Sequence, residues 1–171
     1  MNRSMDNTAR EEVQIDGYYP GVLGQVTRVH AVYYHDYWGF DISFETQVGK
    51  ELSQFMIDFQ ENRDVFRSAI VNNEFAGAVA IDGSLSETEG ARLRWFIVDP
   101  KFQGLGIGHK LIRAALDFCK QANHNRIFLW TFEGLDPARR LYEREGFQLI
   151  EENRLDQWGS TITEQKFELG L

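Results

Sequence analysis

The spacing of hydrophobic residues changes along the chain, and each change marks a predicted element. A first strand is expected from Glu12 to Tyr19, ended by Pro20-Gly21. Two runs with helical spacing follow, Val22, Val26, Val29, Tyr33, Tyr37 and then Phe44, Val48, Leu52, Phe55, Phe59. Trp38-Gly39 is expected to end the first helix, and Asp41 or Ser43 to cap the second.

The second half of the chain combines strand and helix patterns. The run "VFRSAIVNNEFAGAVAIDG" predicts a hairpin around Asn72-Asn73-Glu74, and "ARLRWFIVDP" predicts the next strand. A helix is expected around Leu111 to Ala122, and "RIFLWTF" has the unbroken apolar character of a strand buried on both faces. A short helix from Pro137 to Glu145 and two strands, "FQLIEE" and "STITEQKFEL", complete the pattern.

This order, β-α-α-β-β-β-α-β-α-β-β, predicts a mixed α/β fold. The strand–helix–strand unit in the middle implies parallel pairing, while the hairpins imply antiparallel pairing. A length of 171 residues suits one domain, expected over residues 12–171, and the polar residues 1–11 are expected to form a flexible N-terminal tail.

Composition excludes several classes of protein. The net charge of −8 argues against a nucleic-acid partner, and no apolar run approaches the ~20 residues of a membrane span. One cysteine, Cys119, cannot form an internal disulfide, which favours a cytoplasmic location. The four histidines and one cysteine show no metal-ligand spacing, so no metal site is expected.

Three glycines, Gly104, Gly106 and Gly108, stand at alternate positions between a strand and a helix. A P-loop would need Gly-Lys-Ser/Thr, whereas this chain has Gly108-His109-Lys110-Leu111. A dinucleotide fingerprint would need glycine where His109 or Leu111 stands. Bare amides at a helix start can hold a diphosphate, and the alternative is a tight turn without a ligand.

The segment Gln103–Gly108 fits the pattern R/Q-x-x-G-x-G/A, and "ARRLYEREGF" fits A-x-x-L-Y-x-x-x-G-F about thirty residues downstream. With these motifs the chain resembles the GNAT superfamily of acetyl-CoA-dependent N-acetyltransferases, from about Glu12 to Leu169. It looks closest to the acetyltransferase half of bacterial fusions with a MarR-type regulator, which share "PGVLGQVTRVHAVYY" and "LWT". The implied fold is a three-layer α/β/α sandwich whose mostly antiparallel sheet has splayed parallel fourth and fifth strands.

The resemblance also implies a cofactor site and an activity. Acetyl-CoA would donate its acetyl group to a primary amine of a small molecule or protein, by direct transfer in a ternary complex. The implied diphosphate site comprises Gln103, Gly104, Leu105, Gly106, Ile107, Gly108, His109 and Lys110. The backbone of Phe96, Ile97 and Val98 would hold the pantetheine arm, with Thr131, Ala138 and Tyr142 opposite.

Tyr142 matches the superfamily tyrosine that protonates the departing thiolate. The base stays open among Glu45, His30, Glu133 and water. Leu135 replaces the asparagine that many members use to contact pantetheine, which puts that contact in doubt. A non-catalytic acetyl-CoA sensor or interaction domain is the alternative function, and a homodimer is left open.

Overall fold

The computed structural model describes residues 12–171, and its strands and helices follow the predicted order. The predicted N-terminal tail lies outside the described residues. The elements are β1 (Val13–Asp16), α1 (Val22–Trp38), α2 (Ile42–Ile57), β2 (Val65–Val71), β3 (Glu74–Asp82), β4 (Ala91–Val98), the 3₁₀ turn η1 (Pro100–Phe102), α3 (Ile107–Gln121), β5 (Arg126–Phe132), α4 (Asp136–Arg144), β6 (Gln148–Gln157) and β7 (Ser160–Gly170).

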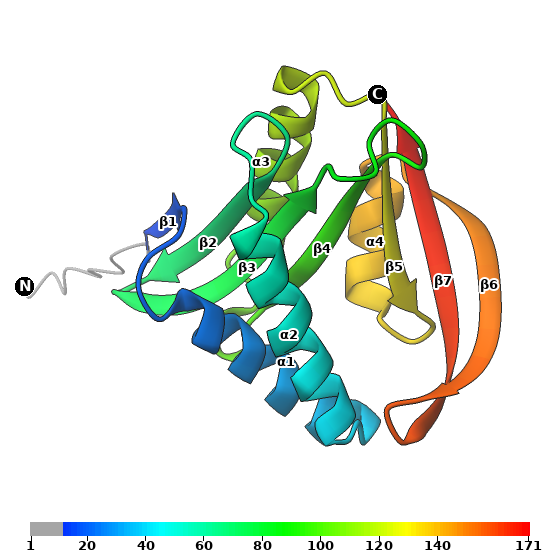
Figure 1. Ribbon diagram of the computed structural model, residues 1–171. Helices are drawn as coiled ribbons and strands as arrows, with labels where there is room; N and C mark the ends of the chain where they lie inside the picture. The colour runs from blue at the N-terminus through cyan, green and yellow to red at the C-terminus, as the bar shows by residue number, and fades with distance from the viewer. Residues whose placement is uncertain (1–11) are drawn as a thin grey trace, which may run out of the picture.

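A seven-stranded sheet with the order β1-β2-β3-β4-β5-β7-β6 forms the middle layer. Its β4–β5 pair is parallel and its other pairs are antiparallel. Helices α1 and α2 cover one face, and α3 and α4 lie on the other (Figure 1). The predicted three-layer mixed α/β fold is therefore confirmed. No helix within residues 12–171 is long and apolar enough to cross a membrane.

Local signals explain where the helices begin and end. The side chain of Asp41 accepts a hydrogen bond from the Ser43 N–H group (2.9 Å), so it is the N-cap of α2. α1 ends at Trp38, as predicted. The second-to-last strand, however, continues to Gln157, well beyond the predicted "FQLIEE". Its continuation is mostly exposed, so it lacks the apolar alternation that would have indicated a strand.

Two hydrophobic cores lie on the two faces of the sheet. The core under α3 and α4 contains Leu93, Leu129 and Leu141, together with the buried thiol of Cys119. The core under α1 and α2 is aromatic, and Phe40 and Phe44 meet there with ring centroids 5.0 Å apart. These cores fix the sheet between two helical layers, so the geometry of β4 and β5 is held from both faces.

The parallel strands β4 and β5 separate after only three register pairs. Their ladder ends at Leu93 and Leu129, although the strands continue to Val98 and Phe132. On its other edge β4 carries a bulge against β3, because the register advances from Ala78↔Ile97 to Ala80↔Arg94. Trp95 occupies the bulge with φ +46°. The second half of β4 therefore has a backbone edge without a neighbouring strand on the β5 side.

Candidate active site

A cavity of about 700 Å³ lies along the divergence of β4 and β5. It is lined by residues 92–98 of β4, by residues 129–132 of β5, and by residues around the start of α3, with contributions from α1, α2, α4 and the β6–β7 turn. The cavity joins three features: the glycine loop (residues 103–108), the free edge of β4, and a charged end formed by Glu51, Arg92, Arg94 and Glu164.

The glycine loop presents backbone N–H groups at the start of α3. Gly106 is the N-cap residue, has φ +74° and contributes no side-chain cap. The first helical hydrogen bond runs from the Lys110 N–H group to the Gly106 carbonyl (3.1 Å), so the amides before it have no partner within the helix. A Cβ atom added at Gly104 or Gly106 would meet nothing within 4 Å, so the space above these amides is open. The loop therefore suits an anion.

The side chains around the glycine loop contribute little positive charge to this anion site. His109 lies 3.6 Å from the buried carboxylate of Glu145, which Arg113 also approaches at 3.2 Å. Leu105 and Lys110 have exposed side chains outside the cavity lining, so only their backbone could contribute to an anion site. The amides, rather than a cluster of cationic side chains, dominate this end of the cavity.

Phe96, Ile97 and Val98 line the cavity along the free edge of β4, and Thr131, Ala138 and Tyr142 line it from β5 and α4. The bulge at Trp95 places Trp95 and Ile97 in the core under α1 and α2, while Phe96 packs toward the other face. The structure thus brings together the predicted residues of both walls.

Tyr142 is only 5 % exposed, although it lines the cavity. Its ring lies between those of Phe96 (5.8 Å between centroids) and Phe147 (5.9 Å). Burial raises the pKa of Tyr142 above its ordinary value, and nearby Tyr34 raises it further. The phenol is therefore protonated at neutral pH and can donate a proton into the cavity.

The three candidate bases occupy different environments. Glu45 and Glu133 are exposed and do not line the cavity, whereas His30 lines it and is 5 % exposed. The Nδ1 atom of His30 lies 2.8 Å from the Val26 carbonyl oxygen. Because a carbonyl only accepts, Nδ1 carries the hydrogen and Nε2 has the free lone pair. Burial lowers the pKa of His30 to about 4, so the ring is neutral at pH 7.

The charged end of the cavity was not expected from the sequence. Arg94 forms ion pairs with Glu51 of α2 and with Asp82 of β3 (3.2 Å). Glu164 of β7 also lines this end, and burial raises its pKa above the usual value. The alternation of arginine and apolar residues in "ARLRWF" was the available signal, because a charged face on a central strand needs a partner or a cavity.

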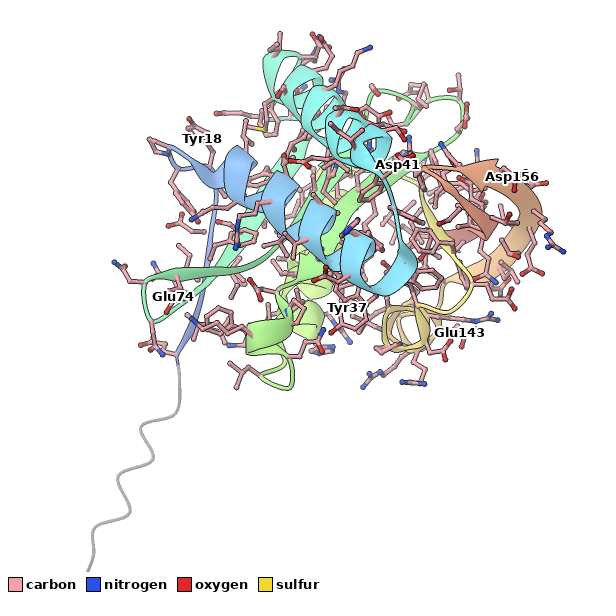
Figure 2. The ribbon with its side chains drawn as sticks, turned by 90° about the horizontal axis from the view of Figure 1, so that it is seen from below. Tyr18, Tyr37, Asp41, Glu74, Glu143 and Asp156 are labelled. Atoms are coloured by element: carbon pink, nitrogen blue, oxygen red, sulfur yellow. The ribbon has the colours of Figure 1, made fainter. Side chains whose placement is uncertain are left out.

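Two turns beside the cavity are tied together. The Asp41 N–H group donates to the Trp158 carbonyl (3.0 Å), and the Trp158 indole donates to Gln47 (2.8 Å). Figure 2, seen from below, shows Asp41 beside the β6–β7 hairpin that carries Asp156. The α1–α2 turn is therefore joined to the β6–β7 turn next to the cavity. On α1, Tyr33 and Tyr34 line the cavity, while Tyr37 is exposed.

This fold agrees with the comparison to protein families. The profile described as the acetyltransferase (GNAT) family matches residues 29–147, more than half of the chain. The chain belongs to the acetyltransferase (GNAT) family. Members of this family use acetyl-CoA, and within residues 12–171 no group of histidine, cysteine and acidic side chains could hold a metal ion.

Individual relatives are consistent with this assignment. A protein of Methanocaldococcus jannaschii named an uncharacterized N-acetyltransferase is 29% identical over 121 residues, which make up 68% of this chain but only 54% of that relative. An acetyltransferase of Streptococcus agalactiae has the same fold, with a TM-score of 0.75 at 23% identity, covering 93% of this chain and 98% of that one. A proposed acetyltransferase of Salmonella typhimurium, solved with its cofactor acetyl-CoA, has a TM-score of 0.70 at 12% identity over 92% and 93% of the two chains.

The buried His30 makes stability depend on pH in a predictable direction. Its pKa falls from 6.5 to about 4 on folding, so the unfolded chain takes up a proton that the folded protein excludes. Between pH 7 and pH 5 this difference should remove roughly 2 kcal/mol from the free energy of unfolding. Urea unfolding of the wild type and of His30→Gln at both pH values measures it. The variant should lose less stability than the wild type; equal losses would contradict the assignment.

Proposed function

We propose that this chain transfers the acetyl group of acetyl-CoA directly to a primary amine in a ternary complex. The observation that carries the proposal is a single cavity that joins the glycine loop, the free edge of β4 and the Tyr142 phenol. Each of these features suits a different part of a thioester of coenzyme A, and their order along the cavity follows the order of those parts.

The glycine loop would hold the diphosphate. Its open backbone amides lie at the positive end of the α3 dipole, which stabilises an anion even on a protein with a net charge of −8. Gly104 and Gly106 leave room for phosphate oxygens to reach these amides, because side chains there would occupy the same space.

The free edge of β4 would hold the pantetheine arm as an added strand. Phe96, Ile97 and Val98 have no parallel partner on β5, so their backbone groups can bond to the amides of the arm. An N–H group beside the bulge at Trp95 would polarise the thioester carbonyl and stabilise the oxyanion formed on attack. Thr131 and Ala138 would enclose the arm from the opposite side.

Tyr142 would protonate the leaving thiolate. In this step the amine nitrogen forms a bond to the acetyl carbon, the carbon–sulfur bond breaks, and the sulfur takes the phenolic proton. The nitrogen loses its surplus proton as it becomes an amide, and that proton returns through water to the phenolate of Tyr142. Burial raises the pKa of the phenol, and the same low-polarity surroundings raise the pKa of the thiol that forms beside it. The two groups therefore remain matched for proton transfer inside the cavity.

The acceptor ammonium must lose a proton before it attacks, since its pKa of ~10.4 keeps it charged at pH 7. We infer that this proton leaves through the Nε2 atom of His30 or through water beside it, because Glu45 and Glu133 do not line the cavity. The resemblance to acetyltransferases fused to MarR-type regulators is also part of this proposal. It suggests the alternative of an acetyl-CoA sensor that does not catalyse transfer. A sensor without catalysis would bind acetyl-CoA but release no thiol with any amine.

Replacement of Gly106 by asparagine tests the diphosphate site. Asparagine tolerates the left-handed backbone, but its side chain would occupy the open space above the amides. We expect the affinity for acetyl-CoA to fall by about tenfold or more, and the thermal stabilisation by acetyl-CoA to shrink accordingly. Gly21→Asn is the matched control, because Gly21 is also a left-handed N-cap with open space. Equal stabilisation of both variants by acetyl-CoA would argue against the site.

Replacement of Tyr142 by phenylalanine tests the acid. The ring contacts remain while the transferable proton is lost, so kcat should fall by ~10²-fold to 10⁴-fold. The affinity for acetyl-CoA and the melting temperature should change little. Tyr37→Phe is the control, because Tyr37 is 68% exposed and does not line the cavity. Full activity of a folded Tyr142→Phe enzyme would remove Tyr142 from the mechanism.

A further inference from the structure

Arg92 stands out among the charged groups of the cavity. It lies near the start of β4, lines the charged end and is partly buried. Within residues 12–171, its guanidinium forms neither a hydrogen bond nor an ion pair, although Glu51, Asp82 and Glu164 act on it from a distance. A partly buried guanidinium without a partner has lost hydration that no protein group replaces.

The neighbouring arginine shows why the nearby carboxylates do not fill this role. Arg94 holds Glu51 and Asp82 in ion pairs, and its guanidinium lies 4.1 Å from the centroid of the Trp95 ring. Glu164 lines the same end of the cavity but is not within ion-pair distance of Arg92. Arg94 is thus a structural cation, whereas Arg92 is available to a ligand.

The position of Arg92 suits a group on the acceptor rather than on the cofactor. It precedes the bulge at Trp95 by three residues, which corresponds to roughly 10 Å along a strand. The glycine loop lies beyond the opposite end of β4. An arginine side chain is long enough to cover much of this distance, so a small acceptor can bind its carboxylate to Arg92 and keep its amine beside the bulge.

The chemistry of this end favours a carboxylate. A planar guanidinium binds a carboxylate through two parallel hydrogen bonds, and such charge-assisted pairs are strong where water is excluded. Glu164 and the paired Glu51 disfavour a doubly charged phosphate. The negative charge of Glu164 also attracts an ammonium group that the ligand carries next to its carboxylate. Together these groups suit a zwitterion.

We propose that the acetyl acceptor is a free amino acid, whose carboxylate binds Arg92 and whose ammonium group faces Glu164. This inference rests on the proposed acetyl transfer and specifies its acceptor. A lysine side chain of a protein carries no carboxylate beside its ammonium group, so the pair of Arg92 and Glu164 favours a free amino acid over a protein chain.

Matched amines test the inference. Each amino acid is compared with the amine that lacks only its carboxylate: lysine with cadaverine, phenylalanine with phenethylamine, and methionine with 3-(methylthio)propylamine. Thiol release from acetyl-CoA gives kcat/KM for each member. For the wild type we expect at least one amino acid to exceed its decarboxylated partner by roughly 10-fold to 100-fold. Phosphoethanolamine and a lysine-containing peptide test the phosphate and protein alternatives.

Variants then assign the preference to one side chain. Arg92→Met should remove the preference for the carboxylate and raise KM for the amino acid, while kcat/KM for the amine partner changes little. Lys166→Met is the matched control, because Lys166 lies over the rings of Phe128 (4.8 Å) and Trp130 (5.6 Å) without lining the cavity. That variant should keep the preference. An unchanged preference in Arg92→Met would overturn the assignment to Arg92.

The outcomes separate this inference from the proposed function. If acetyl-CoA binds and the amines or the peptide are acetylated while every amino acid is inert, the amino-acid acceptor is refuted and acetyl transfer stands. If acetyl-CoA does not bind, acetyl transfer fails, and calorimetry of lysine and cadaverine with the protein still tests the Arg92 site. Binding of lysine that Arg92→Met abolishes would support that site, whereas equal binding of both probes, or none, would refute it.

Discussion

The backbone of β4 beyond Leu93 is the constraint on which the rest of the site depends. Every buried N–H and C=O group needs a partner, yet β5 leaves this edge after three register pairs. In most sheets such a gap would be closed by another strand. Here the two hydrophobic cores hold β4 and β5 apart, so the gap remains as a cavity of about 700 Å³. A ligand that itself carries amide groups can complete the edge.

The other features of the site follow from this gap. The strand β4 leads through η1 into the glycine loop, so an arm bonded along its edge is already directed toward the start of α3. The helix α4 follows β5 across the gap and carries Tyr142 against Phe96 of β4. The bulge at Trp95 turns the aromatic side chain into the core under α1 and α2. The same bulge leaves the arginines of the first half of β4 to form the charged end.

Local sequence signals were sufficient to predict the fold and to propose the glycine loop as a binding site. Caps such as Asp41, the change between helical and strand spacing, and the alternate glycines act over a few residues, so they can be recognised without a structure. The resemblance to GNAT enzymes added two further predictions, the splayed strands and the role of Tyr142. The roles of the individual site residues stay predictions until a ligand is placed.

The charged end could not be predicted in the same way. Glu51, Arg92 and Glu164 come from α2, β4 and β7, and only the packed sheet brings them to one cavity. The sequence also gave no reason to choose among His30, Glu45 and Glu133, because burial and not residue type separates them. The extension of β6 to Gln157 was missed because an exposed hairpin needs no apolar alternation.

A crystal structure of the protein with coenzyme A tests the central claim most directly. The account predicts that the diphosphate contacts the amides of residues 103–108, that the pantetheine amides pair with the edge of β4 at Phe96 to Val98, and that the thiol lies between Thr131 and Tyr142. A complex in which the free edge of β4 stays unpaired, or in which the thiol lies far from Tyr142, would contradict it.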